Sequence, residues 1–122
     1  MLKVALFKDN ASIVGTYGAA TTNYTDMTGN SDEASGVGYT VTGATLTNVT
    51  PVASGTTAIT EFADVTWTTA TIIARGALIY NTTAAGAAIG VIDFGVDKTS
   101  SGGDFSILWP TFDSTNAIIR IA

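Results

Sequence analysis

Carboxylates are the most plentiful chemically active side chains of this chain, which has ten Asp and Glu but no His and no Cys. Their absence excludes Ser-His-Asp catalysis, cysteine nucleophiles, and metal sites built on imidazole or thiolate. A pair of carboxylates is sufficient for glycoside hydrolysis. Two groups of acids lie close enough in sequence for this role: Asp26, Asp32 and Glu33, and Asp93, Asp97 and Asp104. Because glycine and serine flank these acids, we interpret them as solvated turn residues and expect no enzymatic activity.

Two further patterns are typical of metal sites. Asp93-Phe94-Gly95 spells the tripeptide that positions magnesium in protein kinases, but no glycine-rich phosphate loop, strand lysine or catalytic loop accompanies it. Asn30, Asp32 and Glu33 carry oxygen ligands at intervals that suit calcium, yet the alternating acids of an EF-hand are absent. We therefore predict neither a metal nor a cofactor.

Aromatic side chains offer one more kind of chemistry, the stacking of sugar rings. Five of them lie beside or within a predicted strand: Tyr39, Trp67, Tyr80, Phe94 and Trp109. Either a sugar-binding platform or the packing of a core explains such residues. Their positions in strands favour core packing.

Composition excludes several classes of partner. The net charge of −5 and only five scattered Lys and Arg argue against nucleic acid, whose phosphates require a basic cluster. The most apolar stretch, residues 84–92, is about half the length that crosses a membrane, so we expect no membrane span. We also find no signal peptide pattern. A hydrophobic fraction of 46% in 122 residues predicts one folded domain, residues 1–122.

The elements that position these residues are expected to be strands, because threonine, valine and isoleucine favour pleated backbone. Short apolar segments separated by turns lie at 1–8, 39–42, 44–50, 57–62, 70–75, 77–80, 88–94, 104–109 and 117–122. Residues 98–103 are predicted to be a flexible turn. This spacing predicts an all-β protein, a single antiparallel β-sandwich or jelly-roll-like domain, and a partly open barrel also fits.

Residues 16–36 interrupt this pattern, since apolar residues are scarce there. We predict one long loop in the N-terminal half, with a short helical turn around residues 24–27. Loops of this length in small domains are commonly functional.

Several segments, taken in order, carry a resemblance to a known family. They are LKVALF (2–7), EASGVGYTVTGATL (33–46), DVTWTTATIIARGALIYN (64–81), VIDFGVDKTSSGGDFSILWP (91–110) and AIIRIA (117–122). Together they resemble a family of small structural proteins of tailed bacteriophages, variously described as capsid decoration, cement, head or tail proteins.

This resemblance implies a capsid decoration (cement) protein on the exterior of the virion. Such a protein binds the outer surface of the shell and bridges neighbouring major capsid proteins, here as a homo-oligomer for which we expect a homotrimer. It needs no catalytic group. The alternative is a tail or head-fibre module that binds a host surface glycan.

Two segments are the predicted contact surfaces. The loop at 16–36 is too long for a simple connector, and the N-terminal strand is expected to present a free edge. The predicted interface residues are Leu2, Val4, Leu6, Tyr24, Asp26, Met27, Asp32 and Glu33.

Overall fold

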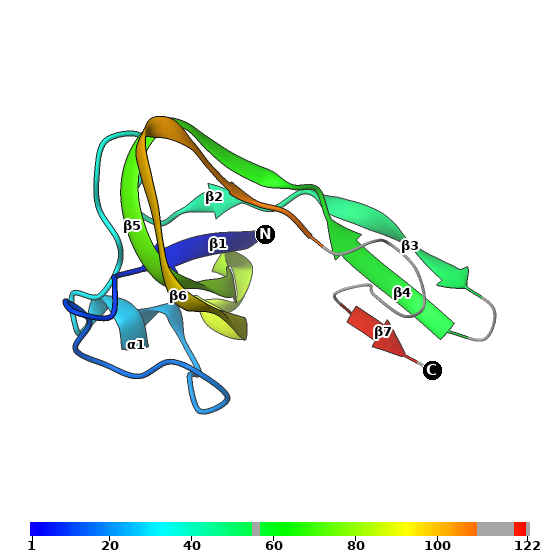
Figure 1. Ribbon diagram of the computed structural model, residues 1–122. Coiled ribbons are helices and arrows are strands. Elements are labelled where there is room, and N and C mark those ends of the chain that lie inside the picture. The colour runs from blue at the N-terminus through cyan, green and yellow to red at the C-terminus, as the bar shows by residue number, and fades with distance from the viewer. Residues whose placement is uncertain (55–56, 110–118, 122) are drawn as a thin grey trace. The chain divides into compact units, whose positions relative to one another are not determined.

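The computed structural model describes residues 1–54, 57–109 and 119–121 (Figure 1). The strands are β1 (Leu2–Phe7), β2 (Ala44–Thr45), β3 (Asn48–Ser54), β4 (Thr57–Phe62), β5 (Val65–Asn81), β6 (Ala87–Ile107) and β7 (Ile119–Ile121). The helices are α1 (Tyr24–Thr28) and the 3-10 helix η1 (Thr82–Ala84). Neither helix is long and apolar enough to cross a membrane, and the described residues contain no other.

The chain forms two compact units. One comprises Met1–Thr45 and Trp67–Phe105, and the other comprises Leu46–Thr66 and Ser106–Ala122, so β5 and β6 contribute residues to both. The single domain predicted from the sequence stays a prediction.

The first unit contains an open four-stranded antiparallel sheet in the order β2-β1-β5-β6. This confirms a mostly β chain. The predicted strand at 1–8 is confirmed as β1, which pairs with β5 along its whole length, from Leu2↔Asn81 to Phe7↔Gly76.

The expected free edge on β1 is wrong. Lys3 and Val4 pair with β2 on the side opposite β5. Further along, the amide of Ala34 donates to the carbonyl of Leu6 at 2.8 Å. Residues within the range 32–45 therefore occupy this edge, and β1 is an interior strand.

Two further predictions, a turn at 98–103 and a strand at 39–42, also differ from the structure. Residues 98–103 lie within β6 because Ser100 and Gly102 bind β5: the Ser100 hydroxyl donates to the Ala70 carbonyl at 2.8 Å, and the Gly102 amide donates to Thr71 Oγ1 at 3.1 Å. The segment predicted as a strand at 39–42 has no strand structure. Gly43 lies beside it with φ of 83°, and a Cβ there would come within 1.9 Å of the Val4 carbonyl oxygen. The backbone at this point must therefore turn and pack directly on β1.

The core of the first unit lies on both faces of β1 and β5. On one face, α1 and the long loop cover a cluster formed by Ala5, Phe7, Met27, Leu78 and Tyr80. Val4, Leu6 and Ile79, at the alternate positions, are also buried. The predicted helical turn is confirmed as α1, whose N-cap Asn23 and Asp26 form a capping box.

The second unit contains the antiparallel sheet β3-β4-β7. The register of β3 against β4 shifts between Val49 and Val52, around Pro51, which has no amide to donate. Trp109 packs edge-on against Phe62 with ring centroids 5.7 Å apart, and its indole N–H donates to the Ala63 carbonyl at 3.0 Å.

Candidate functional site

Asp32 lies in the long loop at residues 16–36, and 0% of its surface is exposed. Its Oδ1 accepts the amide of Val14 at 2.8 Å, and its Oδ2 accepts the amide of Gly15 at 2.7 Å and the hydroxyl of Tyr17. All three donors come from the segment just after β1. The carboxylate therefore fixes the backbone of residues 14–17.

Two effects on the pKa of Asp32 oppose each other. Burial disfavours the charged form, but the hydrogen bonds from Tyr17, Gly15 and Val14 outweigh it and lower the pKa. Burial and the same Asp32 contact raise the pKa of Tyr17 to about 12. Across the neutral range the site therefore holds an ionised carboxylate and a neutral phenol.

Glu33 organises a second part of the chain between β1 and β2. It accepts hydrogen bonds from the hydroxyls of Tyr24 and Tyr39 and from the amide of Thr42, the last two at 2.7 Å. The Tyr39 oxygen in turn accepts the amide of Leu6 at 3.1 Å. Burial, followed by the contact with Glu33, raises the pKa of Tyr24 and of Tyr39. Glu33 thus connects α1, the loop before β2, and β1.

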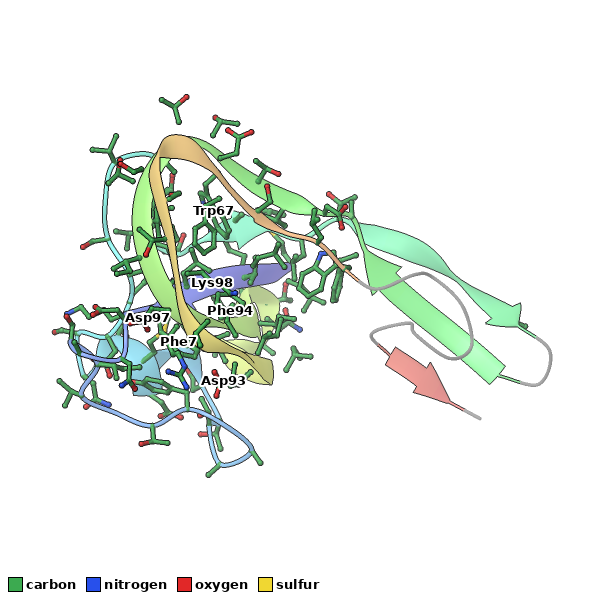
Figure 2. All side chains as sticks on the ribbon, viewed as in Figure 1. Phe7, Trp67, Asp93, Phe94, Asp97 and Lys98 are labelled. Carbon is green, nitrogen blue, oxygen red and sulfur yellow. The ribbon has the colours of Figure 1, made fainter. Side chains whose placement is uncertain are left out.

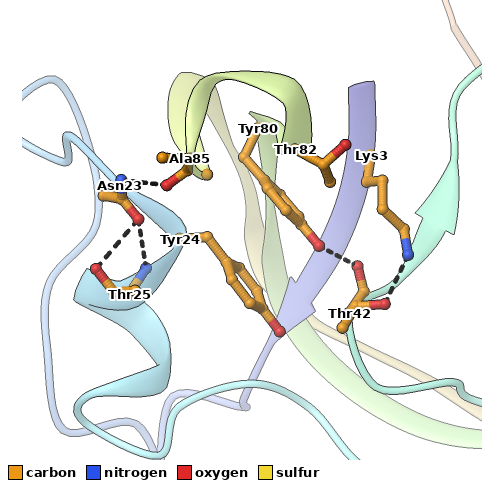
Figure 3. A pocket seen from close by; sticks show the side chains of 9 residues that line it. Lys3, Asn23, Tyr24, Thr25, Thr42, Tyr80, Thr82 and Ala85 are labelled. Atoms are coloured by element: carbon orange, nitrogen blue, oxygen red, sulfur yellow. Dashed lines mark hydrogen bonds between the residues drawn. The ribbon is translucent and has the colours of Figure 1, made fainter. Parts of the chain in front are cut away.

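A hollow of about 350 Å³ lies beside this network (Figure 3). Tyr24 stacks on Tyr80, with ring centroids 4.3 Å apart and planes 11° from parallel. Thr42 closes one side: its carbonyl accepts the Tyr80 hydroxyl and its Oγ1 accepts the Lys3 ammonium, both at 2.6 Å. The lining residues are Lys3, Asn23, Tyr24, Thr25, Thr42, Tyr80, Thr82, Ala85 and Gly86.

The interpretation of the first acidic group as solvated turn residues is wrong for Asp32 and Glu33. Both carboxylates face hydrogen-bond donors inside the fold, because residues 14–17 and 39–42 supply those donors. Asp26 is exposed, but it accepts the amides of Thr22 and Asn23, and these bonds lower its pKa. Each of the three acids therefore holds backbone in place.

The second acidic group fits the sequence interpretation better. Asp93, Asp97 and Asp104 are all exposed on β6, where Figure 2 labels the first two. Asp93 accepts the Gly95 amide at 2.8 Å and the Arg75 guanidinium at 3.1 Å, and these contacts lower its pKa. Asp97 accepts the Asn10 amide at 2.9 Å. Within the described residues, no group of three or more acidic, His or Cys side chains is placed to hold a metal ion.

Four of the predicted interface residues are buried within this chain: Val4, Leu6, Met27 and Asp32. Leu2, Tyr24 and Glu33 are half-buried, and Asp26 is exposed. The structure brings Tyr24 and Glu33 into direct contact. Their contact with a partner stays a prediction.

The aromatic residues of the first unit mostly pack in its core. Trp67 and Tyr80 are buried, which confirms core packing for both. Trp67 packs against Tyr39 and Phe105, at centroid distances of 5.7 and 6.1 Å, and Phe94 contacts Phe105 at 6.4 Å.

Sequence reasoning missed the three residues that complete the acid–tyrosine network: Tyr17, as a donor to Asp32, and Tyr39 and Thr42, as donors to Glu33. The available signal was the placement of tyrosines around the adjacent acids Asp32 and Glu33: Tyr17 and Tyr24 precede them and Tyr39 follows them. This part of the sequence is otherwise poor in apolar residues. Comparisons with known proteins add no family: no family model matches the chain, and searches of curated proteins and of solved structures find no match.

Proposed function

We propose that this chain is a capsid decoration (cement) protein of a bacteriophage. It binds the outer surface of the shell as a homotrimer, bridges neighbouring major capsid proteins, and has no catalytic role. The ordered segments that surround Asp32 and Glu33 carry the proposal, and the resemblance of the sequence to phage structural proteins supports it.

Order in these segments matters because a flexible segment loses conformational freedom when it binds, and this loss opposes association. Asp32 holds the amide of Val14, and Glu33 holds the amide of Thr42 beside Val41. The carbonyl of Val37 accepts the Thr71 amide of β5 at 2.8 Å. Each of these backbone segments is therefore fixed before any partner arrives.

The same segments expose apolar side chains. Val14, Val37 and Val41 are 75%, 71% and 66% exposed. Apolar side chains on a fixed backbone provide contact area at a low entropic cost. In a shell, many copies also turn modest individual contacts into firm attachment.

Binding to shells tests this proposal. Purified protein is mixed with capsids stripped of their decoration, and the bound fraction is measured by co-sedimentation. We expect the wild type to bind and the triple variant Val14→Ser, Val37→Ser, Val41→Ser to bind about tenfold more weakly. Ile73→Ser, at a residue 42% exposed on β5, is the matched control and should bind as the wild type does. Failure of the wild type to bind would overturn the proposal.

The finer architecture, a β-sandwich or jelly-roll, also remains a proposal. The presence of two separate antiparallel sheets, β2-β1-β5-β6 and β3-β4-β7, supports it. Nuclear Overhauser contacts between side chains of β3–β4 and those of β1–β5 would establish packed sheets, and their absence would argue against a sandwich.

A fibre module that binds a host glycan is the second candidate. The hollow favours it, because an ammonium and hydroxyl groups, those of Lys3, Thr42 and Thr82, line it together with Tyr24. NMR titration with host surface saccharides tests this function. Saturable shifts confined to the amides around the hollow would support glycan binding, and unchanged spectra would contradict it.

A further inference from the structure

The outer strand of the four-stranded sheet, β6, has an edge that no described strand covers. β6 is hydrogen-bonded to β5 on one side and stands at the end of the strand order. On its other side, Ala87 bridges to Asn23, and the Ala88 amide donates to the Thr22 carbonyl at 2.9 Å. From Ile89 to Phe105, none of the strands in the described part of the chain lies beside this edge.

The exposed side chains of β6 between Ile89 and Phe105 include three acids, Asp93, Asp97 and Asp104, and one lysine, Lys98. Arg75 of β5 pairs with Asp93. Asp93 and Asp97 each use Oδ1 for their contacts, with Arg75 and Gly95 and with Asn10 respectively. Their Oδ2 atoms have no partner within the described residues. Ile89 and Val96 add apolar surface, at 51% and 58% exposed.

We infer that the edge of β6 between Ile89 and Phe105 is a strand-addition site for an extended, basic segment of the capsid protein. The inference rests on the proposed function and names its mode of contact. Unpaired backbone N–H and C=O groups at a sheet edge bind an extended chain by main-chain hydrogen bonds. Lys or Arg residues of that segment would face the acidic side chains of β6.

Charge selects this occupant over a second copy of the chain. Arg75 pairs with Asp93, and Lys98 offsets one of the other two acids, so one carboxylate of each copy would stay uncompensated if two β6 edges paired with each other. Like charges across a strand pair are destabilising, whereas opposite charges stabilise the pair. A basic segment from another protein therefore fits this edge better than the edge fits itself.

Lysine substitutions test the edge directly. The double variant Ile89→Lys, Val96→Lys places cations where the basic segment should lie, and we expect about tenfold weaker binding to stripped capsids. Ile73→Lys introduces one lysine on β5, an interior strand, and should bind as the wild type does. Thermal melting of each variant establishes that it is folded.

Hydrogen exchange on the wild type gives a second readout that requires no variant. On binding to the shell, amide exchange across residues 89–105 should slow by about tenfold or more, because new strand hydrogen bonds protect the edge. Binding with unchanged exchange in this segment would overturn the inference and leave the proposed function standing. No binding to shells would overturn both. A dimer of free wild-type protein that the double variant abolishes would assign the edge to a second copy and overturn the inference.

Discussion

Acidic residues with similar sequence surroundings occupy opposite environments in this protein. Asp32 and Glu33 lie inside a network of amide and tyrosine donors, whereas Asp93, Asp97 and Asp104 lie exposed on β6. The difference arises from what the chain brings to them. Residues 14–17 and 39–42 fold over Asp32 and Glu33, and no described strand covers the edge that carries Asp93, Asp97 and Asp104. Neighbouring glycine and serine therefore do not decide whether a carboxylate is structural.

The largest expected effect follows removal of the buried carboxylate. Asp32→Ala leaves the amides of Val14 and Gly15 and the Tyr17 hydroxyl without their acceptor. We expect the free energy of unfolding to fall by about 3 kcal/mol. Urea denaturation followed by tryptophan fluorescence measures it.

Asp97→Ala is the matched control from the exposed group. It should leave the denaturation midpoint nearly unchanged, because the Asn10 amide that it frees is exposed to water. Equal losses in the two variants would break the contrast between the acidic groups.

Glu33→Gln is expected to have the next largest effect. The side chain keeps its size, but its new amide group faces a hydroxyl or an N–H that needs an acceptor. We expect a loss of about 2 kcal/mol. In the same variant, hydrogen exchange at residues 39–42 should accelerate, and a wild-type exchange pattern would argue against the role of Glu33 in ordering this segment.

The pH dependence of stability sharpens the comparison on both sides of neutrality. Because the folded pKa of Asp32 is lowered, its stabilisation is present above the unfolded value of about 3.9 and is lost as the pH falls through the folded pKa. Because the folded pKa of Tyr17 is raised to about 12, its contribution is present below the unfolded value of about 10 and is lost as the pH rises from there. Denaturation midpoints of the wild type and of Asp32→Asn across this pH range measure both losses of stability. An equal loss of stability at acidic pH in the variant would contradict the assignment to Asp32.

The smallest measurable effect is expected at the start of α1. Asn23→Ala removes the acceptor of the Thr25 amide and one half of the capping box. We expect a loss of about 1 kcal/mol in the free energy of unfolding. Asp93→Ala, which breaks an exposed ion pair with Arg75, should give no measurable loss, and a loss there as large as that of Asn23→Ala would show that the exposed acids also stabilise the fold.

Local sequence patterns predicted the strands more reliably than the site. The predicted strand at 1–8 is β1, and the helical turn at 24–27 is α1. The segments predicted as two strands, 70–75 and 77–80, also lie in strand, but they form one continuous strand, β5, with no break at Gly76. By contrast, residues 98–103 have the composition of a turn and lie in β6, because Ser100 and Gly102 bind to β5 about thirty residues away in the chain.

The site depends on such long-range contacts even more strongly. Nothing next to Asp32 in the sequence indicates that Tyr17 and two amides will surround it. The free edge was misassigned for the same reason: the chain continues through residues 32–45 to cover β1, whereas no described strand covers the outer edge of β6. Local periodicity carries no information about which strand a later loop will cover.

Electron microscopy of shells decorated again with the purified protein tests the central claim most directly. The account predicts ordered density at fixed sites on the outer lattice, with the segments that carry Val14, Val37 and Val41 turned toward the shell. A bare outer surface, or bound protein with these segments facing solvent, would contradict it.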